Sequence, residues 1–221
     1  MARVLIIGAS GGIGSALVAA CQVRGDDVVG LSRSADGLDL TDAASVTAIL
    51  GSLEGTFDAV VVATGALEIE GAAPEKTLKA ITAKAMADQF AINAIGPALI
   101  LGQVSDLLPR DRRAVVAVLS ARVGSIGDNR LGGWVSYRAA KAALNQIVHT
   151  AAIELGRSHP HTICVSLHPG TVATAFTAKY LGRHPAVAPK EAAENMLRVL
   201  DGLTVEQSGG FYDWAGTEVP W

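Results

Sequence analysis

Short runs of β-branched residues alternate with longer alanine-rich segments along this chain, and this alternation constrains the fold more than any other feature. The first run, residues 4–7, leads through a helical segment to a second run, residues 28–31. Strands joined by helices in this way run parallel, with right-handed crossovers. We therefore predict an α/β fold, a doubly wound parallel sheet of about seven strands with helices on both faces. Strands are expected at residues 4–7, 28–31, 57–63, 114–119, 162–167 and 210–213, and helices at residues 13–24, 42–50, 74–108, 136–157 and 189–203.

The length and composition fit one domain. A chain of 221 residues can bury a substantial core, and no Pro/Ser-rich linker, short-period repeat or change in composition marks a boundary. Of the residues, 50% are hydrophobic and 18% are charged, as expected for a sheet that is covered on both faces. We expect a single Rossmann-fold domain over residues 1–221.

Charge and hydropathy exclude several classes of function. The formal net charge is −3 and like charges form no block, so we expect neither nucleic-acid nor membrane binding. The apolar runs are too short to span a bilayer, and the first residues lead directly into a predicted strand, so no signal peptide is expected. Cys21 and Cys164 fall in a predicted helix and a predicted buried strand, which favours packed thiols over a disulfide or a nucleophile. These features are typical of a cytoplasmic protein.

A glycine-rich turn follows the first predicted strand. Its sequence is Gly8-Ala9-Ser10-Gly11-Gly12-Ile13-Gly14. Glycine permits a tight turn and lets a phosphate approach the backbone, and the following helix N-terminus adds free amides and a favourable dipole. The G-x-x-x-G-x-G spacing differs from the general dinucleotide fingerprint G-x-G-x-x-G. A merely flexible glycine loop is the alternative, but the strand, turn and helix context favours a dinucleotide phosphate site.

Tyr137 and Lys141 are four residues apart in the helix predicted for residues 136–157. This spacing places the phenol and the ammonium one above the other on one helix face. Lowering the pKa of a tyrosine from about 10 to about 7 needs roughly 4 kcal/mol of preferential stabilisation of the phenolate. Lys141 and a cationic nicotinamide ring would supply it. A lone Y-x-x-x-K pair is typical of an ordinary amphipathic helix, but together with the glycine turn it indicates a hydride-transfer site.

The glycine turn with Tyr137 and Lys141 resembles the short-chain dehydrogenase/reductase family, and the resemblance covers essentially the whole chain. It implies that Tyr137 is the general acid/base and that Lys141 also holds the nicotinamide ribose. It implies further that Asn93 holds a water at a helix kink, in a proton relay that reaches Lys141. Other matches are Asp39-Leu40 at an adenine contact, Ala63-Thr64-Gly65 after a strand, and Pro169-Gly170-Thr171-Val172-Ala173-Thr174 at the nicotinamide carboxamide.

Within that family the chain looks like the C-factor/sniffer-like branch, which includes carbonyl reductases and proteins studied for cell signalling. Relatives often pair through two helices, which here are near residues 88–108 and 136–157, so a homodimer or homotetramer is expected. The narrower resemblance rests on Ser120-Ala121-Arg122-Val123-Gly124-Ser125-Ile126, Gly132-Gly133-Trp134, Gly210-Phe211-Tyr212-Asp213-Trp214 and Pro220-Trp221.

The sequence departs from the family pattern at two positions. Thr64 replaces the usual Asn of an Asn-Ala-Gly segment, and its hydroxyl can still support the turn. Ala121 stands where the family has its catalytic serine, whose hydroxyl polarises the substrate carbonyl. Ser120 should point away from the side that Ala121 faces, so Ser125 in the following loop is the favoured replacement. The alternative is that neither serine is catalytic and that Ser125 only makes a local turn contact.

The end of the second predicted strand bears on the choice of cofactor. NAD specificity normally places a carboxylate there, whereas an arginine accommodates the 2′-phosphate of NADP. Ser32 occupies the carboxylate position, and Arg33 follows with a guanidinium that can bind two phosphate oxygens and stack on adenine. A plain surface arginine is the alternative role. We expect NADP(H) as the cofactor, with NAD(H) as the alternative.

The remaining polar and aromatic residues are less specific. The five histidines form no ligand pattern and the cysteines no cluster, so no metal is expected. His168 abuts Pro169, where a packing role is more common than a contact to the nicotinamide. Trp134 and residues 176–187 flank the tyrosine or follow the Pro-Gly turn, so they are expected to border the substrate, with a small lid at about residues 171–188.

Together these features predict an NADP(H)-dependent carbonyl reductase or alcohol dehydrogenase that acts on a small-molecule aldehyde, ketone or alcohol. Tyr137 would give a proton to the carbonyl oxygen while hydride arrives from the nicotinamide. The rival interpretation is a cofactor-binding signalling or regulatory protein of the same fold with little turnover. Ala121 supports the rival, whereas Tyr137, Lys141 and Asn93 favour an enzyme. The fold does not name the substrate.

Overall fold

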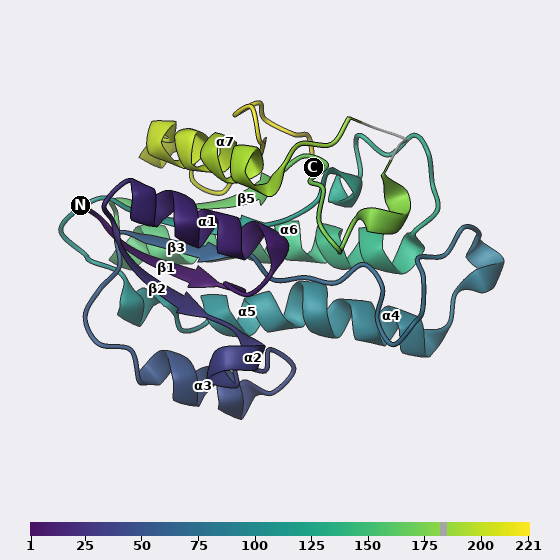
Figure 1. The fold of residues 1–221 in the computed structure, drawn as a ribbon, viewed down its shortest axis with the longest axis horizontal. Coiled ribbons are helices and arrows are strands. Elements are labelled where there is room, and N and C mark those ends of the chain that lie inside the picture. The colour runs from purple at the N-terminus through teal and green to yellow at the C-terminus, as the bar shows by residue number, and fades with distance from the viewer. Residues whose placement is uncertain (182–184) are drawn as a thin grey trace.

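A computed structural model describes residues 1–181 and 185–221, and its centre is one parallel sheet (Figure 1). Six strands lie in the order β2-β1-β3-β4-β5-β6, and every neighbouring pair is parallel. All six predicted runs form strands, and no further strand joins the sheet in the described ranges, so β2 lies at an edge. The strands are β1 (Arg3–Ile7), β2 (Asp27–Leu31), β3 (Ala59–Val62), β4 (Ala114–Leu119), β5 (Thr162–His168) and β6 (Phe211–Asp213).

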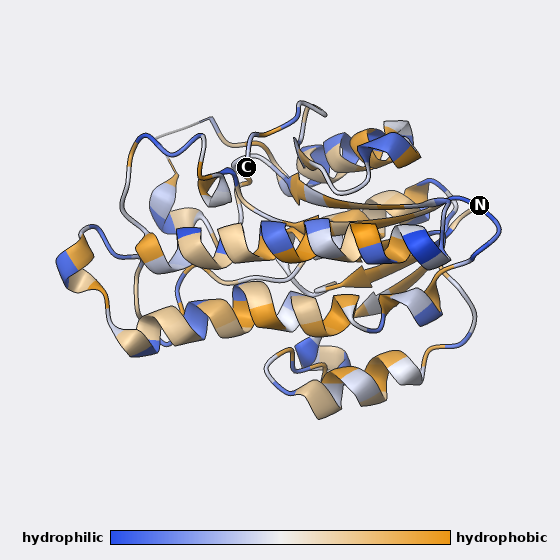
Figure 2. Ribbon diagram, turned by 180° about the vertical axis from the view of Figure 1, so that it is seen from behind, coloured by the Kyte–Doolittle hydropathy of each residue, from blue (hydrophilic) through white to orange (hydrophobic). Residues whose placement is uncertain are grey.

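Helices cover both faces of the sheet (Figure 1). One core lies between the sheet and α1 and α7, and the other lies between the sheet and α3, α5 and α6. Figure 2 shows that the strands are mostly hydrophobic, whereas the helices carry mixed faces, as expected for elements with one side in water. The helices are α1 (Gly12–Val23), α2 (Arg33–Asp36), α3 (Ala43–Gly51), α4 (Ala83–Phe90), α5 (Gly96–Leu101), α6 (Val135–Ser158) and α7 (Pro189–Gly202).

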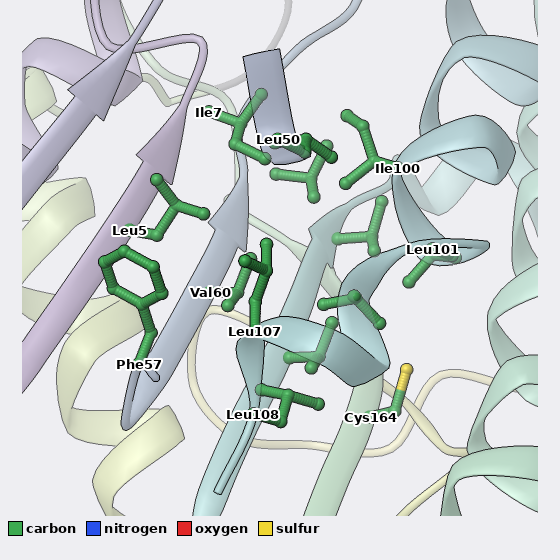
Figure 3. Packing of buried hydrophobic residues seen from close by; sticks show 14 of the residues in the cluster. Leu5, Ile7, Leu50, Phe57, Val60, Ile100, Leu101, Leu107, Leu108 and Cys164 are labelled. Carbon is green, nitrogen blue, oxygen red and sulfur yellow. The ribbon is translucent and has the colours of Figure 1, made fainter. Parts of the chain in front are cut away.

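Side chains alternate between the two cores along each strand. In the core shown in Figure 3, Leu5 and Ile7 of β1 pack with Val60 of β3, Ile100 of α5 and Cys164 of β5. Their sequence neighbours on the strands face α1 and α7 instead. Cys21 and Cys164 are free and buried in opposite cores, which confirms their assignment as packed thiols.

The long helix predicted for residues 74–108 is wrong at both ends. Residues before Thr82 form a loop, and α4 begins at Ala83 because the Thr82 hydroxyl accepts a hydrogen bond from the Ala85 amide at 3.1 Å. The helix then passes through a π-helical turn at Ala91–Ile95 and ends at Leu101. A 3₁₀ helix at Val104–Leu107 follows.

Most of the predicted site residues lie in loops that follow the carboxyl ends of the strands, at one edge of the sheet. The glycine turn follows β1, Thr64 follows β3, Ser120 follows β4 and Pro169 follows β5. In open parallel sheets this edge is where ligands bind. No helix in the described ranges is both long enough and apolar enough to cross a membrane.

Candidate active site

The glycine turn between β1 and α1 leaves backbone amides exposed. Gly8 has a φ of 96°, and a Cβ added at Gly14 would lie 2.1 Å from the Gly8 carbonyl oxygen, so both positions require glycine. The α1 N-cap, Gly11, has no side chain, and the first turn of α1 holds no acidic residue. Ser10, Gly11 and Gly12 are exposed and Ile13 is half-buried. An anion can therefore reach the positive end of α1.

The loop after β5 converges on this turn. A Cβ added at Gly12 would lie 2.6 Å from Thr174 Cγ2, so the two predicted cofactor segments touch. Gly170 packs against the indole of Trp214, and Val172 is buried. These contacts hold the loop after β5 next to the glycine turn. Thr64 at the end of β3 also lies at this edge, and its Oγ1 is buried without a hydrogen-bond partner among the residues that the structure describes. These groups fit a dinucleotide that lies across the carboxyl edge.

The adenine end of the predicted cofactor site lies beyond β2. Ser32 caps the short helix α2, since its hydroxyl accepts a hydrogen bond from the Ala35 amide at 3.2 Å. Asp36 folds back to accept from the Ser32 amide at 2.7 Å, whereas Arg33 is exposed. Asp39 accepts from Thr41, whose hydroxyl and amide hold the pKa of that carboxyl below its usual value. Leu40 beside it is partly buried against the core.

Tyr137 and Lys141 lie on the buried face of α6. Tyr137 is 5% exposed and Lys141 is 3% exposed. Lys141 Nζ donates to the carbonyl oxygen of Leu119 at 2.9 Å and lies 6.0 Å from the centroid of the Tyr137 ring. Burial lowers the pKa of Lys141 to about 7 and raises that of Tyr137 above its usual value. The phenol is therefore protonated at neutral pH and holds the proton that a carbonyl oxygen would need.

Asn93 lies in the π-helical turn that separates α4 from α5. Its Oδ1 accepts from the Ala66 amide at 3.0 Å, and its Nδ2 donates to the Ala66 carbonyl at 2.8 Å and to Gln89 Oε1 at 2.6 Å. A Cβ added at Gly65 would lie 3.0 Å from Asn93 Oδ1 and 3.6 Å from Lys141 Nζ, so the three residues meet. A π turn interrupts the regular hydrogen bonds of a helix, as the predicted kink requires.

Both candidate serines direct their hydroxyl protons to protein acceptors. Ser120 Oγ donates to Asn145 Oδ1 of α6 at 2.6 Å. Ser125 Oγ donates to the Pro220 carbonyl and accepts from the Asp128 amide at 3.0 Å. Ser125 thus makes the local contact that the sequence offered as its alternative role, and adds a distant partner at Pro220.

Glu75 is a site residue that the sequence pattern did not reveal. Its carboxylate accepts hydrogen bonds from the Ser136 hydroxyl and from the Ser136 amide, the latter at 3.2 Å. Burial works against ionisation of Glu75, but these hydrogen bonds prevail and hold its pKa below the usual value. Glu75 therefore fixes the N-terminus of α6 one residue before Tyr137. No local motif marks this role, because Glu75 and Ser136 lie 61 residues apart.

The ring of Trp134 lies between those of Tyr137 and Tyr180 and contacts both. Trp134 has its ring edge-on to Tyr137, with centroids 6.3 Å apart, and edge-on to Tyr180, with centroids 5.2 Å apart. Tyr180 lies within the predicted lid and donates to Glu68 Oε1 at 2.9 Å. At the base of the lid, Val172 and Val187 form a parallel bridge. Residues 182–184 of the predicted lid lie outside the described ranges.

Comparisons with known proteins agree with this geometry. The short chain dehydrogenase family model matches residues 37–183. The 1-hydroxy-2-glutathionyl-2-methyl-3-butene dehydrogenase of Rhodococcus sp. (strain AD45) is 31% identical over an alignment of 236 residues that covers 100% of both chains. The C-signal protein of Myxococcus xanthus is 42% identical over 141 residues, covering 62% of this chain and 78% of its own. The NADPH-bound carbonyl reductase from chicken fatty liver is 25% identical, with a TM-score of 0.82 over 100% of this chain and 99% of that chain.

Proposed function

This chain belongs to the short-chain dehydrogenase/reductase family of NAD(P)-dependent oxidoreductases, and we propose that it reduces an aldehyde or ketone to an alcohol with NADPH. The observation that carries the proposal is the buried pair Tyr137 and Lys141, which lies at the edge where the glycine turn meets the loop after β5. The similar NADPH-bound carbonyl reductase supports the direction of the reaction.

The residues at the carboxyl edge would share the binding of the cofactor. The exposed Gly12 amide at the N-terminus of α1 would hold the pyrophosphate, and Arg33 would hold the 2′-phosphate. Lys141 would hold the nicotinamide ribose, and the loop at residues 169–174 would orient the carboxamide. When bound, NADPH supplies the hydride that the carbonyl carbon accepts.

Tyr137 would give its proton to the carbonyl oxygen of the substrate. Its phenol is protonated in the folded protein, so it can act as a general acid at neutral pH. Lys141, whose pKa is about 7, can gain a proton and stabilise the phenolate that remains. Asn93, next to Gly65 and Lys141, would hold the water through which the proton returns.

The aromatic residues beside Tyr137 would border the substrate. Trp134 contacts Tyr137 directly, and Tyr180 brings the lid at about residues 171–188 against Trp134. Leu131 and Phe176 are exposed in the loops around this position, at 86% and 42%. Exposed apolar side chains at this position favour a carbonyl compound with an apolar body.

We also propose that the protein is a cytoplasmic homodimer that pairs through α5, α6 and the neighbouring π turn. Ile95 and Ile153 lie on these elements and are 51% and 52% exposed, which a partner would cover. Light scattering at micromolar concentration should return about twice the chain mass of 22.7 kDa. A monomer mass alone would contradict this pairing.

The test of the reductase proposal is a single-turnover reaction of the protein in excess over NADPH, with a panel of aldehydes, ketones and quinones. We expect loss of absorbance at the nicotinamide band, with one alcohol formed for each NADPH consumed. NADPH binding without turnover on any member of the panel would instead favour the signalling or regulatory role that the C-signal relative suggests.

A further inference from the structure

The site lacks one donor that carbonyl reduction requires. As hydride arrives, negative charge gathers on the carbonyl oxygen, and a second hydrogen bond besides that of Tyr137 stabilises it. Ala121 has no hydroxyl to offer. The hydroxyls of Ser120 and Ser125 already donate hydrogen bonds to Asn145 Oδ1 and to the Pro220 carbonyl.

His168 lies at the carboxyl edge of the sheet, beside the strand end that leads to Ala121. It is the last residue of β5, directly before the Pro169 loop, and its register partner on β6 is Asp213. On the other side, the Ser120 amide donates to the Leu167 carbonyl at 2.9 Å, so the end of β4 runs beside His168. The imidazole therefore belongs to the centre of the carboxyl edge, between Ser120 and Asp213.

Strand alternation directs His168 toward α6. Ile163, Val165 and Leu167 of β5 face the core under α1 and α7, whereas Cys164 faces the core under α6. His168 is four residues after Cys164 and thus shares its side, the side on which α6 presents Tyr137 and Lys141. The charge of Lys141 contributes to the titration of His168, which agrees with their placement in one neighbourhood.

The imidazole of His168 is uncharged at neutral pH, and one of its two ring nitrogens has no hydrogen-bond partner among the described residues. Burial lowers its pKa to about 4; Asp213 opposes this shift, while Arg122 and Lys141 add to it. Its Nδ1 is enclosed and has no hydrogen-bond partner among the described residues. A buried group without a partner calls for a functional explanation. A neutral imidazole carries one N–H and can polarise a carbonyl without competing with Tyr137 as the acid.

We propose that His168 donates the second hydrogen bond to the carbonyl oxygen of the substrate, in place of the serine hydroxyl that Ala121 lacks. This inference rests on the proposed reductase function. His168 keeps its proton throughout: hydride adds to the carbonyl carbon, the C–O π electrons move to oxygen, and the proton that oxygen takes comes from Tyr137. His168 is then a catalytic residue, because its N–H touches the reacting oxygen.

The test compares His168→Ala with a double variant that restores the family serine. His168→Ala should lower kcat by about 10²- to 10³-fold, the loss expected for one oxyanion donor, with the NADPH dissociation constant unchanged. Adding Ala121→Ser to His168→Ala should recover most of the loss, whereas Ala121→Ser alone should change kcat by less than about threefold. Ser125→Ala should also be nearly silent.

His159→Ala is the matched control. His159 is buried, and its Nε2 has no hydrogen-bond partner within the described ranges, but it follows α6 at the opposite end of the molecule. Its loss should reduce thermal stability and leave kcat unchanged. A second readout that needs no substrate is the NMR titration of His168, which should remain neutral down to about pH 5.

Two results would overturn the inference while leaving the reductase proposal intact. One is a folded, NADPH-binding His168→Ala protein with kcat within about threefold of wild type. The other is a failure of Ala121→Ser to recover activity in the double variant. Absence of turnover in wild type and in every variant, with NADPH bound, would overturn both proposals together.

Discussion

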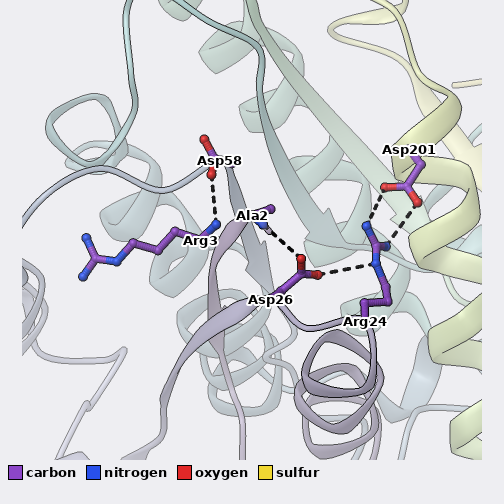
Figure 4. A network of polar contacts seen from close by, with 6 residues as sticks. All are labelled: Ala2, Arg3, Arg24, Asp26, Asp58 and Asp201. Carbon is purple, nitrogen blue, oxygen red and sulfur yellow. Dashed lines mark hydrogen bonds and ion pairs between the residues drawn. The ribbon is translucent and has the colours of Figure 1, made fainter.

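Charged groups at the amino-terminal edge of the sheet are paired with one another, whereas Lys141 at the carboxyl edge is buried with no carboxylate partner among the described residues. Figure 4 shows the first edge, where Arg24 forms ion pairs with Asp26 and Asp201, and Asp58 accepts a hydrogen bond from the Arg3 amide at 2.9 Å. At the opposite edge, Lys141 has a backbone carbonyl in place of a carboxylate.

This difference indicates that charged groups at the amino-terminal edge mainly stabilise the fold. Lys141 at the carboxyl edge is instead a candidate functional group. Paired carboxylates and backbone amides satisfy one another and add modestly to the folded state. A buried lysine without a counter-charge lowers stability, and such groups persist where they act on a ligand. Substitutions at the two edges should therefore have opposite effects on stability and on turnover.

The largest expected effect is at Lys141. Lys141→Met should lower kcat by about 10²-fold or more, because the phenolate of Tyr137 loses its neighbouring charge. The same variant should be more stable at pH 7. The fall in the pKa of Lys141 from 10.5 to about 7 corresponds to a penalty of at most about 5 kcal/mol. Urea unfolding of both proteins measures this gain.

The pH dependence of that gain follows from the sign of the shift. Because the folded pKa lies below the unfolded one, the unfolded chain binds more protons between about pH 7 and 10.5. The stability of wild type should rise over this window on account of Lys141, and the advantage of Lys141→Met should shrink. Lys190→Met, at a lysine that is 86% exposed, is the control and should show neither effect. A pH-independent gain would contradict a buried charge at Lys141.

A smaller effect is expected at Arg33, on the carboxyl edge but in solvent. Arg33→Ala should raise the Michaelis constant for NADPH by about 10- to 100-fold, equivalent to the 1.5–3 kcal/mol of a charged hydrogen bond. Its activity with NADH should change little, since only the phosphate contact is lost. Both specificity constants need to be measured, with Arg157→Ala as a distant control. If the ratio of the specificity constants for NADPH and NADH did not change in Arg33→Ala, Arg33 would not contact the 2′-phosphate.

The smallest effect is expected at the amino-terminal edge. Asp58→Asn should lower the free energy of unfolding by about 1–2 kcal/mol, through weaker bonds to the Arg3 amide and Arg112, with kcat unchanged. Although burial opposes it, these contacts hold the pKa of Asp58 below its usual value of 3.8, so its contribution should be lost as the pH falls below about 4. Asp111→Asn, which removes an exposed partner of the same arginine, should be nearly neutral. A lower kcat in Asp58→Asn would contradict the prediction that substitutions at the amino-terminal edge change stability and not turnover.

The parts of this molecule that could be predicted from sequence are those encoded by local patterns. Hydrophobic runs marked all six strands, and the glycine turn and Tyr137 with Lys141 marked the carboxyl edge that carries the candidate site, because each of these patterns lies within a few residues. The expected seventh strand is absent from the described sheet, and the pattern itself offered only six runs.

Contacts between distant segments account for what the sequence did not predict. Glu75 was predicted to lie inside a helix, yet it lies in the loop before Thr82 and caps α6 through Ser136. Ser125 was favoured as a donor because it is near Ala121, but its hydroxyl donates a hydrogen bond to the carbonyl of Pro220, 95 residues away. No periodicity or spacing rule records such pairings.

The proposed reaction depends most on Tyr137 as the proton donor, and the most direct test is the turnover of Tyr137→Phe. This change removes the transferable proton and keeps the ring that packs against Trp134. With NADPH and an accepted carbonyl substrate, kcat should fall by about two to four orders of magnitude, while the NADPH dissociation constant and the melting temperature stay close to those of wild type. A folded Tyr137→Phe protein that retained most of its turnover would contradict the mechanism.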